Sequence, residues 1–235
     1  MHWPPQIHRC GRLLGAVLDQ TLGVASPGTP ELARFLRGNL APRRDDSTEG
    51  GCRSPVPRGV CSIVALGPYD GGLGEIVARA KYTPERDSWR VLGDWLGLEL
   101  LASLSALEAD PIIVPVPSPC WRRWHRGLDH AGILAGSVAR CMGVSSRPWL
   151  RSRWRPPQVA CDREGRRRIE DAITTSALWH LDDRRRGRRR LEGRRCVVLV
   201  DDVCTTGATL SACASRLRDL GFQSIHAGVI CRSNS

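Results

Sequence analysis

Apolar positions recur along the chain in two different rhythms, and from residue 61 onward the two rhythms alternate. Short apolar runs rich in β-branched residues predict buried strands at residues 61–66, 112–116, 197–200 and 224–231. Apolar residues spaced three or four apart predict helices at residues 73–82, 88–107, 130–142 and 208–220. This alternation predicts an α/β fold in which helices cover a parallel sheet.

Turn and capping residues suggest where several of these elements begin and end. Gly67-Pro68 is expected to turn the chain after the first strand, and Asp87 or Ser88 to cap the second helix. Gly143 and Gly221 follow the third and fourth helices, where a left-handed glycine commonly ends a helix.

The first 60 residues show no comparable regularity. Residues 41–59 are rich in Pro, Gly, Arg, Asp and Ser, which is typical of a linker or mobile loop. We predict a partly linker-like segment at residues 1–60 and one domain at residues 61–235. None of the ten cysteines forms a Cys-x-x-Cys pair, so the sequence predicts reduced thiols and no clear zinc module.

The stretch from Val197 to Thr209 carries the most specific chemistry. Its apolar run leads into Asp201 and Asp202, which we expect to end the strand, and then into a turn of small residues before the last helix. Backbone N–H groups at a helix N-terminus bind anions. Adjacent carboxylates repel phosphate but suit vicinal hydroxyls and a hard divalent cation. A ribose phosphate with magnesium carries both kinds of partner: a phosphate for the turn, and hydroxyls and a cation for the carboxylates. The alternative interpretation is an ordinary buried strand and turn with an acidic N-cap.

These thirteen residues resemble, position for position, the signature by which type I phosphoribosyltransferases bind 5-phosphoribosyl 1-pyrophosphate (PRPP). The resemblance implies that Asp201 and Asp202 are catalytic, holding the ribose hydroxyls and Mg²⁺, the ion directly or through water. It implies a 5′-phosphate loop made of Cys204, Thr205, Thr206, Gly207, Ala208 and Thr209. It also implies the fold of that superfamily, a parallel sheet of about five strands with flanking helices and a small hood.

A second informative stretch follows the predicted strand at residues 112–116. The loop after it contains Arg122, Arg123 and Arg126, and guanidinium forks suit pyrophosphate oxygens. If this strand lies beside the strand at 197–200, the three arginines are candidates to bind the pyrophosphate of PRPP. The alternative is a surface loop in which the arginines stack on Trp121 and Trp124.

Further motifs resemble the ComF family of competence-associated proteins, over about residues 61–235. The shared motifs are Ala80-Lys81-Tyr82, Val114-Pro115-Val116-Pro117, Arg126-Gly127-Leu128-Asp129-His130, and Gln158 with Arg166. The chain departs from the family pattern at Leu128, Asp129, His130 and Ile169, and it lacks the four-cysteine zinc module usual in the family.

Two arginine-rich segments have more than one interpretation. The resemblance implies that residues 151–172 form a mobile flap that excludes water from the active site, where Arg151, Arg153 and Arg155 would add charge above the pyrophosphate. A solvated basic face is the alternative. The run 184–190 holds six arginines in seven residues, which favours a solvated, disordered loop over a nucleic-acid contact.

Charge leaves two classes of function open. The formal net charge is +11, and Lys81 is the only lysine among 35 basic residues. A basic protein favours phosphorylated substrates or nucleic acid.

No apolar run is long enough to cross a membrane, and we expect a cytoplasmic protein. No nucleotide-binding P-loop occurs. The leading hypothesis is therefore a phosphoribosyltransferase acting on an amine or nucleobase; the alternative is a non-catalytic PRPP- or nucleotide-binding or DNA-uptake protein of the same fold.

Overall fold

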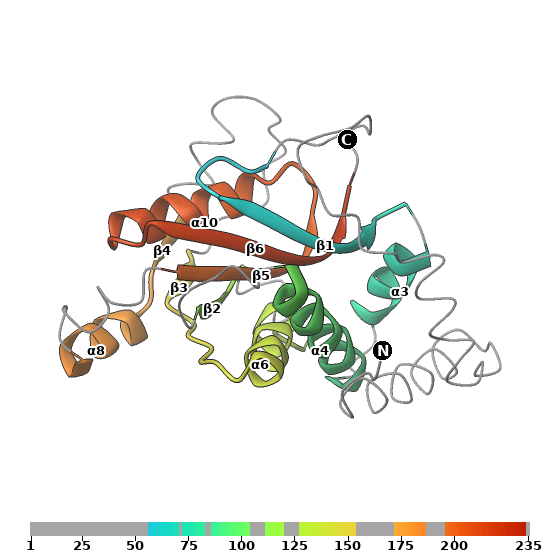
Figure 1. Cartoon of the computed structure of the whole chain (residues 1–235), viewed down its shortest axis with the longest axis horizontal. Helices are drawn as coiled ribbons and strands as arrows, with labels where there is room; N and C mark the ends of the chain where they lie inside the picture. Colours follow the sequence, from blue (N-terminus) through green and yellow to red (C-terminus); the bar gives the residue numbers. More distant parts are fainter. Residues whose placement is uncertain are drawn as a thin grey trace.

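The computed structural model describes residues 56–70, 72–82, 86–103, 111–119, 127–153, 172–186 and 196–233, and the side chains within these ranges except those of 183–186. The elements follow the predicted alternation (Figure 1). In chain order they are β1 (Ser62–Pro68), α3 (Gly72–Ala80), α4 (Arg86–Ser103), β2 (Ile112–Pro115), α6 (His130–Met142), β3 (Leu150–Ser152), β4 (Ile173–Thr175), α8 (Ala177–Arg186), β5 (Cys196–Cys204), α10 (Ala208–Asp219) and β6 (Ser224–Arg232).

Four parallel strands form the central sheet in the order β1-β6-β5-β2. The alternating side chains of β5 point into two separate apolar layers. Val197 and Leu199 pack toward α10, whereas Val198 and Val200 pack toward α4 and α6. Figure 1 shows α10 on one side of the sheet and α4 and α6 on the other. Because both faces are covered, β5 is apolar along its first five residues rather than alternating in polarity.

A small antiparallel pair, β3 with β4, packs beside α10. Trp149 anchors this pair: its ring stacks on Phe222 at a centroid distance of 5.4 Å and meets Trp179 edge-on at 5.0 Å. The Trp149 indole Nε1–H also donates to Asp182 Oδ2 at 2.9 Å, in helix α8. The chain between β3 and β4, where the flap is predicted, lies mostly outside the described residues, so the flap stays a prediction.

Several predicted boundaries are confirmed. Helix α6 spans residues 130–142 as predicted, with Gly143 left-handed at φ 70° as its C-cap. Strand β2 lies beside β5, which is the condition that the pyrophosphate hypothesis required. Strand β6 lies on the other side of β5.

Other predicted boundaries are wrong. Gly67-Pro68 does not turn the chain, because both residues remain in β1 and pair in register with β6. Asp87 and Ser88 do not cap α4, because the helix already includes Arg86. Asp201 and Asp202 lie inside β5, which continues to Cys204 because β6 offers backbone partners along that whole length. The interpretation of 184–190 as a loop is wrong for its first three residues, which end α8, a helix anchored by the buried Trp179.

Candidate functional site

The acidic pair lies at the carboxyl end of a central strand. Asp201 is in register with Val229 of β6, and Cys204, three residues on, is in register with Arg232. Ligands of open parallel sheets bind beyond the carboxyl ends of the strands, so both carboxylates stand where a ligand would arrive. The protein therefore presents two adjacent acids at the functional edge of its sheet.

Lys81 forms an ion pair with the second acid. Its Nζ lies 3.1 Å from Asp202 Oδ2, and only 18% of the lysine side chain and 16% of the aspartate side chain are exposed. The segment that carries Lys81 is fixed by Trp89, whose indole Nε1–H donates to the Ala80 carbonyl at 3.3 Å. The Trp89 ring in turn stacks on His130, the first residue of α6, at 4.3 Å. Lys81 thus reaches the acidic pair from a segment about 120 residues away along the chain.

Lys81 belongs to the Ala80-Lys81-Tyr82 motif, but the sequence alone did not predict that it lies in the site. The available signal was compositional: Lys81 is the only lysine, and every other cation of its class is arginine. A lysine is a compact point charge, and an arginine fork is larger and planar. At a 3.1 Å contact with one carboxylate oxygen beside a second carboxylate, the compact group is the better fit.

The first acid is held differently. Asp201 Oδ1 accepts a hydrogen bond from the backbone N–H of Asp202 at 2.9 Å. Burial raises the pKa of Asp201 well above its ordinary value, and the neighbouring Asp202 charge raises it further. The backbone N–H and the Lys81 ammonium oppose this shift without cancelling it. The pair is therefore asymmetric, since Asp202 forms an ion pair with a lysine whereas burial makes Asp201 keep a proton more readily.

The loop after the acids turns into α10 without a side-chain cap. Gly207 takes the N-cap position in the left-handed conformation, at φ 71°, and makes no side-chain hydrogen bond to the helix. Thr205 and Thr206 are exposed, and Thr206 Oγ1 accepts from the Ala208 N–H at 3.4 Å. The first N–H groups of a helix have no partner within it. The loop residues Cys204 to Thr209 thus form a short backbone turn that suits a phosphate group.

Gly207 could not be replaced without a rearrangement. A Cβ atom on it would lie 2.7 Å from Pro57 Cγ, and positive φ already disfavours other residues. Pro57 lies in the segment just before β1, and its carbonyl accepts the Val60 N–H at 3.0 Å. The loop is therefore shaped both by its own glycine and by a residue 150 positions earlier.

Arg232 is a second residue that sequence reasoning missed. It ends β6 with only 8% of its surface exposed, beside the loop and in register with Cys204. Its charge lowers the pKa of the Cys204 thiol, although burial raises that pKa more. A buried arginine at the start of a phosphate loop adds positive charge where an anion would lie. Sequence reasoning missed it because the strand was predicted to end one residue earlier.

The other predicted site residues cannot be placed. Arg122, Arg123 and Arg126 lie outside the described residues, as do Gln158 and Arg166. The described strand β2 and its neighbour β5 bring the start of the predicted pyrophosphate loop to the same edge as the acidic pair. That Arg122, Arg123 and Arg126 bind pyrophosphate stays a prediction.

The acidic pair alone does not surround a metal ion. Asp202 Oδ2 is paired with Lys81 and Asp201 Oδ1 accepts a backbone N–H, so each carboxylate has one oxygen engaged. Within the described ranges, no group of three or more His, Cys, Asp or Glu side chains could hold a metal. Mg²⁺ takes six ligands and keeps several waters. Two carboxylates with one further oxygen each would therefore leave most ligand positions of a Mg²⁺ ion to water or to oxygens of a bound ligand.

Comparisons with known proteins agree with this geometry. The family described as "Phosphoribosyl transferase domain" matches residues 158–235, which include β5, the acidic pair, the loop and α10. "Competence protein F" of Haemophilus influenzae is 25% identical over 176 residues, covering 73% of this chain and 72% of that protein. The chain therefore has ComF-type relatives and a match to the phosphoribosyl transferase domain. "DNA utilization protein YhgH" of Escherichia coli (strain K12) is 25% identical over 182 residues, with the same coverage.

The match to the phosphoribosyl transferase domain, together with the parallel sheet and its flanking helices, confirms the fold class predicted from the PRPP signature. A protein of Salmonella typhimurium, also named "DNA utilization protein YhgH", is 26% identical over 181 residues. No helix in the described part of the chain is both long and apolar enough to cross a membrane.

Proposed function

We propose that this protein, like the ComF type that it resembles in sequence, has a phosphoribosyltransferase fold that binds PRPP, and that it transfers the phosphoribosyl group to an amine or nucleobase, releasing pyrophosphate. The observation that carries the proposal is the continuous unit of β5, Asp201, Asp202, the Gly207 loop and α10, within the region that matches the phosphoribosyl transferase domain. This unit combines acceptors for a diol with a backbone turn for a phosphate. Few ligands other than a ribose 5-phosphate require both at this spacing.

In this proposal the loop holds the 5′-phosphate through backbone N–H groups, aided by the hydroxyls of Thr205, Thr206 and Thr209. The acidic pair accepts hydrogen bonds from the ribose hydroxyls. The bond from the nucleophile's nitrogen to ribose C1 forms as the bond from C1 to pyrophosphate oxygen breaks, and the nitrogen then passes its proton to the departing pyrophosphate or to water. The carboxylate of Asp202 favours the positive charge that develops on the ribose ring.

Lys81 contributes by forming an ion pair with Asp202 before the ligand binds. When a ribose hydroxyl approaches Asp202, it competes with an ammonium group already 3.1 Å away. The lysine side chain has rotational freedom, so it can shift toward a phosphate or pyrophosphate oxygen of the bound ligand. Magnesium, if delivered on the pyrophosphate, would neutralise the leaving group.

Thermal unfolding with PRPP and Mg²⁺ tests the binding step. Ligand at 100 times its Kd adds about 2.7 kcal/mol to the free energy of unfolding, which raises Tm by about 5–10 °C in a domain of this size. Asp201→Asn and Asp202→Asn should each abolish the shift relative to the same variant without ligand. Asp87→Asn is the matched control, because it removes an exposed carboxylate on α4, away from the site. No shift at millimolar PRPP in the wild-type protein would contradict the proposal.

Release of pyrophosphate from PRPP with a panel of amines and nucleobases tests catalysis separately. The names of the relatives, "Competence protein F" and "DNA utilization protein YhgH", support the alternative that the fold serves DNA handling without transfer chemistry. A PRPP-dependent Tm shift without pyrophosphate release under any acceptor would favour that alternative. Release that disappears in Asp202→Asn would favour the transferase.

A further inference from the structure

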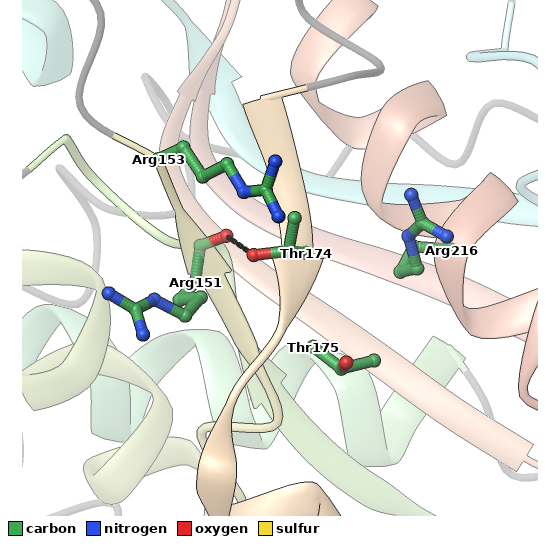
Figure 2. A pocket seen from close by; sticks show the side chains of 5 residues that line it. All are labelled: Arg151, Arg153, Thr174, Thr175 and Arg216. Carbon is green, nitrogen blue, oxygen red and sulfur yellow. Dashed lines mark hydrogen bonds between the residues drawn. The ribbon is translucent and has the colours of Figure 1, made fainter.

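A charged cavity lies between the β3–β4 pair and α10, and its described lining does not include the acidic pair. Its volume is about 490 Å³, and it is lined by Arg151, Arg153, Thr174, Thr175 and Arg216 (Figure 2). Small-molecule sites commonly occupy about 300–1,000 Å³. Among the described residues, the lining contains three arginines and two hydroxyls but no carboxylate and no aromatic side chain.

Arg153 and Arg216 provide the positive charge of this cavity. In Figure 2, Arg153 extends toward Thr174 on β4, and Arg216 reaches the cavity from α10. The guanidinium of Arg151 points away from the other two, while its backbone carbonyl accepts from Thr174 Oγ1 at 3.5 Å. Arg151 therefore contributes mainly to the wall.

The walls of the cavity are held by hydrogen bonds. The Arg153 N–H donates to the Ala172 carbonyl at 2.8 Å, which continues the ladder beyond β3. Arg216 Nε–H donates to the Ile173 carbonyl at 3.3 Å and so joins α10 to β4. One edge of the Arg216 guanidinium is thereby oriented, and Nη1 also pairs with Asp219 Oδ2 at 3.3 Å.

The charge in the cavity is not balanced from within the described residues. No carboxylate there forms an ion pair with Arg153, and the one acid that meets Arg216 is a half-exposed residue on its own helix. Guanidinium groups bind phosphate oxygens in paired, directional hydrogen bonds. A polar cavity without aromatic side chains recognises charge rather than the face of a base.

This cavity is separate from the loop at Gly207. Arg216 follows Gly207 by nine residues on a continuous helix, which places the two about 13 Å apart along the helix axis. Arg153 lines this cavity together with Arg216 of α10, and its predicted role in a flap above the pyrophosphate stays a prediction.

We infer that this cavity, referred to below as the Arg153–Arg216 pocket, is a second anion site that binds a phosphate group. The phosphate could belong to a free phosphorylated molecule or to the backbone of a nucleic-acid strand, and the chemistry of recognition is the same for both. The inference does not depend on the proposed transferase activity.

Binding of two probes to the full chain tests the inference. The probes are inorganic pyrophosphate and a fluorescently labelled oligothymidylate, each titrated into the wild-type protein, Arg153→Gln, Arg216→Gln and the double variant. Each lost arginine contact should weaken binding of the recognised probe about tenfold. The matched control is Arg90→Gln, which removes one exposed arginine, paired with Asp87 on α4, and should have a much smaller effect.

The pattern of losses identifies the source of the phosphate. Weaker binding of pyrophosphate alone points to a free phosphorylated molecule. Weaker binding of the oligonucleotide, with the slope of log affinity against log salt reduced by about 0.7 per lost contact, points to a strand. If neither probe binds, or if the pocket variants lose no more than Arg90→Gln, the inference is wrong. Loss of the PRPP-induced Tm shift in the pocket variants would also overturn it, because the pocket would then be part of the first site.

Discussion

The two anion sites proposed at the two ends of helix α10 are built in different ways. At its N-terminus, the loop around Gly207 offers backbone N–H groups, and two carboxylates precede it in the chain. Near its C-terminus, Arg216 joins Arg153 in a pocket whose described lining consists of arginine and threonine side chains. The first site suits a ligand that carries both a phosphate and hydroxyls, whereas the second suits a phosphate alone.

The two kinds of site differ in how many separate segments of the chain must come together to form them. A backbone site is encoded within about a dozen consecutive residues, because the turn and the helix that form it are local. A side-chain site gathers residues from separate elements and exists only when they pack together. The two sites should therefore respond differently to substitution: the first to changes in backbone geometry, the second to changes in charge.

The largest effect should come from Gly207→Val. A β-branched residue at φ 71° is strained, and its Cβ would meet Pro57 Cγ at 2.7 Å. We expect a loss of about 2 kcal/mol or more in the free energy of unfolding and no PRPP-induced Tm shift. Urea unfolding measures the first and thermal unfolding the second, and the Arg153–Arg216 pocket should still bind its probe in the folded variant.

Gly136→Ala in α6 is the control for this substitution. A Cβ there would meet no atom within 4 Å, so alanine should stabilise the helix by about 0.5–1 kcal/mol. If Gly207→Val unfolded at the same urea concentration as the wild-type protein, the loop would not require its left-handed glycine.

The next largest effect should be a difference in stability between variants of Asp201 and of Asp202. Asp201→Asn removes a carboxylate that is costly to ionise where it is buried, and asparagine keeps an oxygen that can accept the Asp202 N–H. We expect Asp201→Asn to stabilise the free protein and Asp202→Asn to destabilise it, since the latter leaves Lys81 without its partner, each by on the order of 1 kcal/mol. Chemical unfolding at pH 7 measures both, and equal effects would contradict the asymmetry of the pair.

The pH dependence of stability follows from the same asymmetry. The pKa of Asp201 is higher in the folded protein than the value of about 3.9 for an unperturbed aspartate, so the folded state binds more protons over that interval. The Asp201 contribution should therefore stabilise the fold at low pH and be lost as pH rises through the folded-state pKa. Unfolding free energies across acid to neutral pH should show this fall in the wild-type protein and not in Asp201→Asn.

Lys81→Met tests whether the lysine charge influences this pH dependence. The Lys81 charge lowers the pKa of Asp201, so its removal should move the fall in stability to higher pH. Lys81→Arg keeps the charge and should leave the profile nearer to that of the wild-type protein. A profile that is identical in Lys81→Met and the wild-type protein would show that the lysine does not act on the acidic pair.

The smallest effect on stability is expected at the pocket. Arg216→Gln loses the hydrogen bond from Nε to the Ile173 carbonyl, which is only partly buried, and should cost about 0.5–1 kcal/mol. Urea unfolding measures this loss. The Tm shift with PRPP should be unchanged, in contrast to the shift in Gly207→Val. A loss well above 1 kcal/mol would indicate that Arg216 mainly holds the β3–β4 pair in place.

Much of the fold could be predicted because its signals are local. Helix α6 begins and ends where periodicity and Gly143 indicated, and β5 is a continuous apolar run between polar residues. The boundaries that failed depend on a partner strand: β1 passes through Gly67-Pro68, and β5 passes through the acidic pair, because β6 pairs with both. Helix α8 was not predicted because its anchor, Trp179, packs on Trp149 and Phe222 from other elements.

The sequence by itself determined the α/β class, the order of the main elements and the local unit of acids, turn and helix, since each depends on neighbouring residues and backbone sterics. Only the tertiary structure decided which charges meet: Lys81 with Asp202, Arg232 with the phosphate loop, and Arg153 with Arg216. These pairs join segments far apart in the chain. Their contact depends on how the helices and strands pack, which no local pattern encodes.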